Sequence, residues 1–306
     1  MNDLQNFHGK TILITGANGM LGRGFQEALS DAPECRILAL GREELDITER
    51  ENVIGFATEN PDIIIHCAAF VNAEGCEENP ELCRAVQVEG TRNIADLAAK
   101  TGAKVLYPQS FLIFDGKTNP IAEDTPPAPQ SVYGHCKLEA EEIIRAECSD
   151  AIVVRMAGFF GGEEKDKNFV GKFVHHLHHL IESGTKTFDV GDRVWQPTYT
   201  LDLARNCVAL LAANKSGLYT MACHGEASFY KLAAACVEEL GLSDRITINQ
   251  VSAERFNTQE KARRPDRAIM LNNRLDTEGL DLQRPWRDAL KDYLDRPYFR
   301  TLFSDI

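Results

Sequence analysis

The stretch that decides the fold lies near the amino terminus, where the chain reads Lys10-Thr-Ile-Leu-Ile-Thr-Gly16-Ala-Asn-Gly19-Met-Leu-Gly22. A short apolar run ends at Gly16, and a helical pattern follows from Met20 to Ser30. In that context the first glycine permits the turn, the second lets the backbone approach a pyrophosphate, and the third lets helix and strand pack closely. A glycine turn without a ligand is the plainer alternative.

Further short apolar runs follow, and helical patterns separate most of them. The clearest helical pattern covers Glu81 to Lys100, and another covers Val132 to Cys148. This alternation requires parallel pairing, and right-handed crossovers place helices on both faces of the sheet. We therefore expect an α/β fold with a Rossmann-type, doubly wound parallel sheet. The apolar runs are residues 36–40, 62–69, 104–110 and 151–157.

The pattern loosens after residue 160. We expect residues 1–160 to form a dinucleotide-binding domain and residues 161–306 to form mainly a smaller substrate-binding lobe. This lobe should lie over the carboxyl ends of the strands, with some of its segments packing back on the main sheet. Its helical stretches are 169–182, 201–214, 229–240 and 286–294, and its strand-like pieces are 217–222 and 246–251.

Charge and composition narrow the classes of function. The 306 residues carry 33 Lys plus Arg against 46 Asp plus Glu, a net charge of −13, which disfavours binding to nucleic acid or to anionic membranes. Residues 1–10 are polar and lack the apolar core of a signal peptide, so we expect a cytoplasmic protein. The nine cysteines contain no Cys-x-x-Cys motif, and we expect reduced thiols.

The choice of dinucleotide is indicated by Arg42, which stands 20 residues past Gly22 at the end of the second apolar run. An acidic residue there would hold a free ribose 2′-hydroxyl, whereas arginine favours a 2′-phosphate. Pairing of Arg42 with Glu43 or Glu44 is the alternative interpretation. NADP is therefore the preferred cofactor, and NAD stays open.

Tyr133 and Lys137 stand four residues apart at the start of a predicted helix, so both project from one face. An adjacent cation stabilises a phenolate and brings the pKa of the phenol nearer to the working range. Ser110, at the end of the fourth apolar run, can supply a second hydroxyl that polarises a carbonyl group. These three residues are the predicted catalytic set.

Several short segments in one order carry a resemblance to a known family. The chain resembles the extended short-chain dehydrogenases/reductases over essentially its full length, and within them the dTDP-4-dehydrorhamnose reductases. The matching segments are Leu45-Asp46-Ile47-Thr48, His66-Cys67-Ala68-Ala69, Val88-Glu89-Gly90-Thr91, Phe114-Asp115-Gly116, the run Pro197 to Ala204, and Arg263-Arg264-Pro265.

The resemblance implies hydride transfer from NADPH to a keto carbon, with Tyr133 as proton donor, Lys137 on the ribose and Ser110 on the carbonyl oxygen. It also implies that Asp46 and Ile47 border the adenine and that Ala68 and Ala69 line the cofactor. The complete expected cofactor set is Gly16, Asn18, Gly19, Met20, Leu21, Gly22, Arg42, Asp46, Ile47, Cys67, Ala68, Ala69, Tyr133 and Lys137.

Departures from the family pattern fall where the sugar is held. Phe111-Leu112 replaces the usual Asp-Tyr, Gly158 replaces a tryptophan, Trp195 replaces a glycine, and Gln87 replaces an asparagine. The sugar is therefore expected to differ from dTDP-4-dehydrorhamnose. Phe111 and Leu112 also lack the acid and base that a nucleotide-sugar dehydratase needs at this place. The expected substrate-binding residues are Phe111, Leu112, Gly158, Trp195 and Arg264.

Two other functions stay open: an NADP-binding regulatory subunit resembling the beta subunit of methionine adenosyltransferase, and a nucleotide-sugar epimerase. A homodimer is compatible with the resemblance. His175-His176-Leu-His178-His179 offers ring pairs without a matching frame of cysteines or carboxylates, so no metal is expected. Arg263, Arg264 and Arg267 suit a diphosphate, although pairing with nearby acids explains them equally well.

Overall fold

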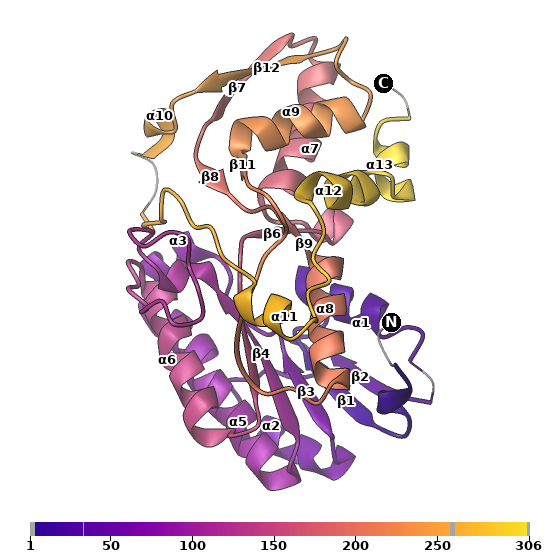
Figure 1. Ribbon diagram of the computed structural model, residues 1–306, viewed down its shortest axis with the longest axis vertical. Helices are drawn as coiled ribbons and strands as arrows, with labels where there is room; N and C mark the ends of the chain where they lie inside the picture. Colours follow the sequence, from indigo (N-terminus) through magenta and orange to yellow (C-terminus); the bar gives the residue numbers. More distant parts are fainter. Residues whose placement is uncertain (1–3, 33, 258–260, 305–306) are drawn as a thin grey trace.

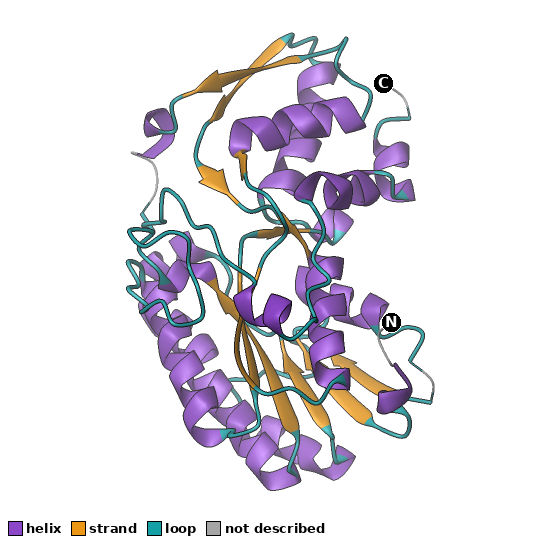
Figure 2. Ribbon diagram, in the orientation of Figure 1, coloured by secondary structure: helices purple, strands orange, loops and turns teal. Residues whose placement is uncertain are grey.

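The computed structural model describes residues 4–32, 34–257 and 261–304; residues 1–3 of the polar amino terminus lie outside this part. Its centre is a six-stranded sheet with strand order β10-β5-β4-β3-β1-β2, and every neighbouring pair is parallel (Figures 1 and 2). The strands are β1 Thr11–Thr15, β2 Arg36–Leu40, β3 Ile63–His66, β4 Lys104–Ser110, β5 Ile152–Met156 and β10 Gly217–Met221.

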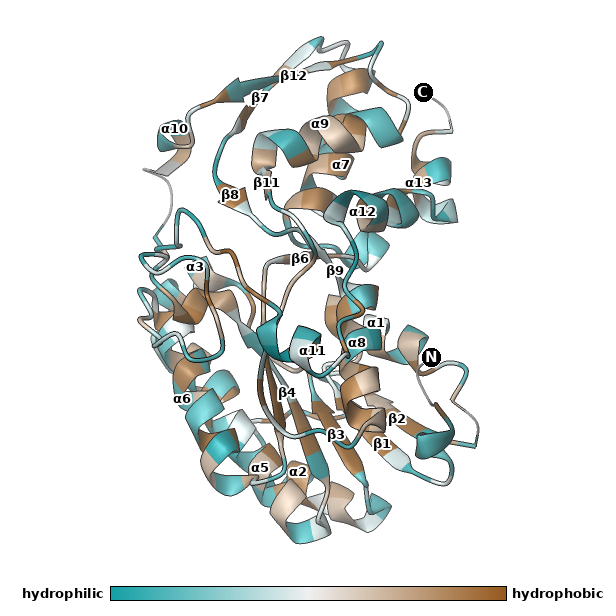
Figure 3. Cartoon of the chain, in the orientation of Figure 1, coloured by the Kyte–Doolittle hydropathy of each residue, from teal (hydrophilic) through white to brown (hydrophobic). Residues whose placement is uncertain are grey.

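Helices cover both faces of this sheet, as a doubly wound fold requires. One apolar core lies under α2 (Arg50–Gly55), α5 (Gly90–Thr101) and α6 (Val132–Glu147). A second core, on the other face, lies under α1 (Met20–Ala28) and α8 (Thr200–Ala212). Figure 3 shows apolar residues along the central strands and polar residues on the outward side of α5 and α6. The predicted fold class is confirmed.

Segments from the second half of the chain contribute to both parts of the molecule. β10 extends the main sheet beside β5, and α8 packs on α1. Most of the remaining segments form a lobe beyond the carboxyl ends of the strands (Figure 1). Its helices are α7 Phe169–Glu182, α9 Phe229–Glu239, α10 Glu254–Asn257, α12 Trp286–Leu294 and α13 Pro297–Leu302; its strand pairs are β7 Thr187–Gly191 with β12 Thr247–Val251, and β8 Val194–Trp195 with β11 Ala227–Ser228.

Short elements complete the chain between these layers. β6 (Phe159–Phe160) pairs with β9 (Thr198–Tyr199) where the chain crosses between the sheet and the lobe. The remaining helices are α3 Ala73–Glu78, α4 Pro80–Arg84 and α11 Asn273–Thr277, and single turns cover Leu4–Phe7, Phe56–Glu59, Phe111–Ile113 and Glu163–Lys165. No helix among the described residues is both long and apolar enough to span a bilayer.

The helix predicted over residues 81–100 contains a wider turn. α4 passes through a π-helical turn, Ala85–Glu89, into α5. Within that turn the Gln87 carbonyl accepts a hydrogen bond from Thr91 Oγ1 at 2.6 Å, and the Gln87 amide donates to the Phe70 carbonyl at 3.1 Å. Such turns occur frequently at functional sites. This one holds the loop that follows β3.

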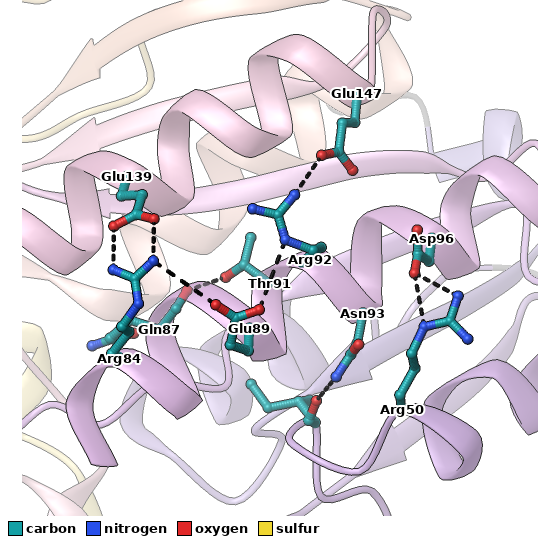
Figure 4. A network of polar contacts seen from close by, with 11 residues as sticks. Arg50, Arg84, Gln87, Glu89, Thr91, Arg92, Asn93, Asp96, Glu139 and Glu147 are labelled. Carbon is teal, nitrogen blue, oxygen red and sulfur yellow. Dashed lines mark hydrogen bonds and ion pairs between the residues drawn. The ribbon is translucent and has the colours of Figure 1, made fainter. Parts of the chain in front are cut away.

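Charged pairs join α6 to α4 and α5 (Figure 4). Arg84 donates two hydrogen bonds of 2.6 Å to Glu139, and Arg92 donates one of 2.9 Å to Glu147. Exposed pairs of this kind contribute little stability each, although the bidentate pair fixes geometry well. They hold in place the helix that carries Tyr133.

Candidate active site

The glycine turn after β1 is shaped by close backbone contacts. Gly16 has a φ of +61°, and a Cβ there would lie 2.7 Å from the N and Cα atoms of Ala68. A Cβ on Gly22 would lie 2.5 Å from the Gly16 carbonyl oxygen. Gly19 caps α1 without a side-chain hydrogen bond, so the first amides of α1 are open to an anion.

The turn lies at the point where the strand order reverses. The chain runs from β1 outward to β2 on one side and, from β3 onward, to β4 and β5 on the other. In open α/β sheets ligands bind at the carboxyl ends of the strands at this reversal. Cys67, Ala68 and Ala69 follow β3 there, and the Ala68 backbone touches the Gly16 turn. The structure thus brings the expected pyrophosphate turn and these residues together.

A buried histidine joins the two strands at this point. Thr91 Oγ1 donates its hydrogen to the Gln87 carbonyl, so it accepts from His66 Nε2 at 3.1 Å. Nδ1 of the neutral ring then accepts from Thr15 Oγ1 at 2.9 Å. Thr15 Oγ1 also accepts from Ala68 N at 3.0 Å. Burial lowers the pKa of His66 to about 3. The ring is therefore a neutral structural link, and its partners are not evident in sequence.

The predicted adenosine end lies after β2. Arg42 is exposed and donates from Nε to Asp46 at 3.3 Å, so its acidic partner is Asp46 and neither Glu43 nor Glu44. A Cβ on Gly41 would meet Asn18 Nδ2, which places Asn18 at the same end. The Ile47 side chain packs into the core against Gly90. Met20 and Leu21 form the first turn of α1.

The three predicted catalytic residues converge at the end of β4. Ser131 caps α6 by accepting from Gly134 N at 3.1 Å, and this cap sets Tyr133 in the first turn of the helix. The Ser110 side chain lies beside the Tyr133 phenol, close enough to lower the pKa of the phenol. Lys137 Nζ donates to the Pro108 carbonyl at 3.0 Å and lies over the Tyr107 ring, 4.1 Å from its centroid.

The pKa values of these groups follow from burial. Burial raises the pKa of Tyr133 above its ordinary value, and the neighbouring Ser110 side chain opposes this rise. A cation beside the phenol would oppose this desolvation, so the lowering by Lys137 stays a prediction. Burial also lowers the pKa of Lys137 to about 7, against the carboxylate of Glu141, which raises it.

Three of the expected substrate residues lie together beside Ser110. Met156 of β5 pairs with Ser110, and Gly158 lies two residues after Met156. A Cβ on Gly158 would lie 2.3 Å from Cε3 of the Trp195 indole and 3.5 Å from Phe111 Cε1. Trp195 comes from β8 of the lobe and packs on Phe229, with ring centroids 5.3 Å apart. The lobe therefore inserts an aromatic side chain into the space that Gly158 leaves.

The other expected substrate residues have different surroundings. Leu112 donates its amide to Ser110 Oγ at 3.2 Å, and its side chain packs against the core under α6. Arg264 donates to Glu74 of α3 at 2.7 Å, and Arg267 donates to Glu226 at 2.6 Å. These two arginines are ion-paired within the fold, which agrees with the interpretation that they offset nearby acids.

The histidine run lies on α7, away from the glycine turn. His178 Nδ1 and His179 Nδ1 lie 3.2 and 3.4 Å from the same Glu182 oxygen. The three ligand atoms lie within 4.8 Å of one another, so a carboxylate that the spacing did not suggest joins two of the histidines. Glu182 and His179 are exposed, and the absence of a metal at this site stays a prediction.

Comparison with known proteins gives a consistent result. The family described as RmlD substrate binding domain matches residues 10–299. A dTDP-4-dehydrorhamnose reductase of Mycolicibacterium smegmatis is 31% identical over 285 residues, covering 92% of this chain and 84% of its own length.

Two solved structures extend this likeness to three dimensions. The dTDP-4-dehydrorhamnose reductase of Clostridium acetobutylicum has a TM-score of 0.85 at 31% identity, with 93% of this chain and 98% of that chain covered. The enzyme of the same name from Bacillus anthracis, in complex with NADP, also has a TM-score of 0.85, at 27% identity and the same coverage.

Proposed function

The chain belongs to the RmlD substrate binding domain family, and we propose that it reduces a 4-keto nucleotide sugar with NADPH. The observation that carries the proposal is the convergence of Ser110, Tyr133 and Lys137 at the sheet edge that also holds the glycine turn. Relatives that are named dTDP-4-dehydrorhamnose reductase, one of them solved with NADP, support it.

The residues present fit a dinucleotide. The cradle between Gly16 and Ala68 is one that any Cβ would fill, and the open amides of α1 suit a pyrophosphate. Arg42 would hold the 2′-phosphate, because its contact with Asp46 uses only Nε of the guanidinium. When bound there, NADPH supplies a hydride to the keto carbon.

The side chains at the end of β4 would handle the proton and the oxygen. Ser110 Oγ would donate a hydrogen bond to the keto oxygen and polarise the carbonyl group. Tyr133 would transfer the phenolic proton to that oxygen, and its raised pKa keeps this proton in place at neutral pH. Lys137 would bind the ribose and stabilise the resulting phenolate.

The sugar pocket would be bounded by Phe111 and by Trp195, which enters from the lobe. Neither Phe111 nor Leu112 can act as an acid or base, so the site suits one hydride and one proton rather than loss of water. The wall formed by Trp195 and Phe111 supports a substrate other than dTDP-4-dehydrorhamnose.

The test is a panel of 4-keto nucleotide sugars incubated with NADPH, with nicotinamide absorbance followed over time. We expect stoichiometric oxidation of NADPH with at least one sugar, and a fall in kcat of about 10²–10⁴-fold for Tyr133→Phe. Conversion between two sugars without net oxidation would indicate the epimerase. NADPH binding without turnover, together with capture of a partner enzyme, would indicate the regulatory subunit.

A further inference from the structure

Gln109 is a buried glutamine beside the proposed catalytic residues, with 3% of its surface exposed. Its Oε1 accepts a hydrogen bond from Ser110 N at 2.8 Å, and its Nε2 donates to the Lys137 carbonyl at 2.8 Å. Nε2 also donates to Glu141 Oε2 at 3.0 Å. Because the first partner is a donor and the other two are acceptors, the partners define the orientation of the amide.

The third partner belongs to a buried ion pair. Glu141 lies one helical turn after Lys137 on α6 and is fully buried, and Arg155 of β5 is 2% exposed. Arg155 donates from Nη2 to Glu141 Oε1 at 2.7 Å and from Nε to Oε2 at 3.2 Å. Arg155 Nη1 also donates to the Glu123 carbonyl at 3.2 Å. A buried pair with this many hydrogen bonds is geometrically rigid.

The contacts of Gln109 therefore connect three elements behind the reacting groups. They join β4, which carries Ser110, to α6, which carries Tyr133 and Lys137, and through the ion pair to β5. The Ser110 backbone and the Lys137 backbone are held by opposite ends of one carboxamide. A change in this side chain would let the two catalytic groups shift relative to each other.

We propose that Gln109 is a positioning residue, which fixes Ser110 and Lys137 relative to each other and anchors both to the Glu141–Arg155 ion pair. The proposal rests on the proposed reductase function, since it is the transfer of hydride and proton that requires this alignment. A displacement of roughly 1 Å at a reacting group can lower a rate about 10²-fold. Glu141 and Arg155 act through Gln109 and touch no substrate.

A purely structural role for Gln109 makes a different prediction, and Gln283 provides the matched control. Gln283 is 6% exposed, and its Nε2 donates to the Asp202 carbonyl and to Asn206 Oδ1, both at 3.2 Å. These partners lie on α8, on the opposite face of the sheet from α6. Gln109→Met and Gln283→Met make the same chemical change at two buried sites.

The experiment compares both variants with the wild-type full chain. We expect both substitutions to lower the unfolding midpoint, because each leaves buried polar groups unpaired. Gln109→Met should lower kcat about 10–100-fold with the KM for the sugar changed less than about threefold, whereas Gln283→Met should keep kcat within about twofold. If Gln109→Met does not fold, Gln109→Asn replaces it, because it keeps the amide but shortens its reach.

A second measurement needs no sugar substrate. NADPH affinity is titrated against pH by nicotinamide fluorescence, and the pH at which affinity declines reports the ionisation of Lys137 beside the ribose. We expect that pH to fall by at least about half a unit in Gln109→Met, as Lys137 moves from Glu141, and to stay unchanged in Gln283→Met.

Two results would overturn the proposal: a loss of kcat in Gln109→Met no larger than in Gln283→Met, or the same pH dependence of NADPH affinity in all three proteins. Failure of the proposed function has a separate signature. A wild-type chain that binds NADPH but reduces no sugar contradicts that function, and the pH dependence of NADPH affinity then decides on Gln109 alone.

Discussion

At Gly16 the backbone of the cofactor turn combines a positive φ with a close backbone neighbour. A side chain at Gly16 would meet two separate penalties. The φ of +61° would strain its backbone, and its Cβ would overlap with the Ala68 backbone at a distance of only 2.7 Å. Gly102 carries the first penalty without the second, because it has a φ of +75° with nothing within 4 Å of its Cβ position.

We expect Gly102→Ala to cost about 1–2 kcal/mol of stability and to leave NADPH affinity unchanged. Gly16→Ala should cost more than this and should weaken NADPH binding at least about tenfold, because the Ala68 backbone must move out of the cradle. Urea unfolding and NADPH fluorescence titration measure the two effects. Equal NADPH affinity in the two variants would show that the turn does not hold the cofactor.

His66 gives the fold a dependence on pH. Its pKa is lowered to about 3 in the folded chain against 6.5 in the unfolded chain, so between these values the unfolded chain binds the extra proton. The free energy of unfolding is therefore not reduced by His66 above about pH 6.5, and it decreases as the pH falls from there toward 3. From pH 7 to pH 5 the loss is about 2 kcal/mol.

Urea unfolding at these two pH values checks this, with His66→Gln as the comparison because an amide does not titrate. The variant should be less stable at neutral pH and should show a smaller loss on acidification. A wild-type slope matched by His66→Gln would exclude the ring as its source.

At the scale of elements, the end of β5 and the strand β8 are fitted to each other through Gly158 and Trp195. The indole lies where a Cβ at Gly158 would be, and Phe229 packs against the Trp195 ring. We expect Gly158→Ala to destabilise the chain by about 1–3 kcal/mol through overpacking. Trp195→Ala should cost about 3–5 kcal/mol and raise the KM for the sugar.

The two substitutions should not be additive. In the double variant the Cβ at position 158 meets no indole, so the loss of stability caused by Gly158→Ala should disappear. Unfolding measurements on the two single variants and the double variant give the coupling free energy. Gly55→Ala serves as the control, because Gly55 has nothing within 4 Å of its Cβ position. Additive costs for positions 158 and 195 would contradict the fitted packing.

The elements show what sequence patterns can and cannot predict. β2, β4, α7 and α12 begin and end where the apolar patterns place them, because local periodicity and burial agree there. The π-helical turn at residues 85–89 is not evident in the pattern, which predicts one continuous helix over residues 81–100. The two-residue strands β6 and β9 depend on each other across the fold and have no local signal.

The candidate site divides in the same way. The glycine spacing and the Tyr133–Lys137 spacing are local and could be found in sequence. Gln109, Glu141 and Arg155 could not, because their importance depends on contacts between residues 14 to 32 positions apart. Arg155 within the apolar run of β5 indicates a buried acidic partner, but the sequence does not show that this partner is Glu141.

At the scale of the whole molecule, the sheet is completed by segments that follow the lobe's first helix. Tyr219 and Met221 of β10 are fully buried beside β5, and α8 buries Leu203, Val208 and Leu210 against α1. A fragment of residues 1–160 lacks both elements. Its β5 edge and the apolar face that α8 covers would then meet water.

We therefore expect residues 1–160, produced alone, to form a compact state without fixed tertiary packing. Such a state shows native-like far-UV circular dichroism, a lost near-UV signal and binding of a hydrophobic dye. It should bind NADPH at least about a hundredfold more weakly than the full chain. The glycine turn leads into α1, and in the fragment α1 lacks the packing that α8 provides. Cooperative urea unfolding and full NADPH affinity in the fragment would show instead that the first 160 residues are an independent folding unit, with β10 and α8 only added to it.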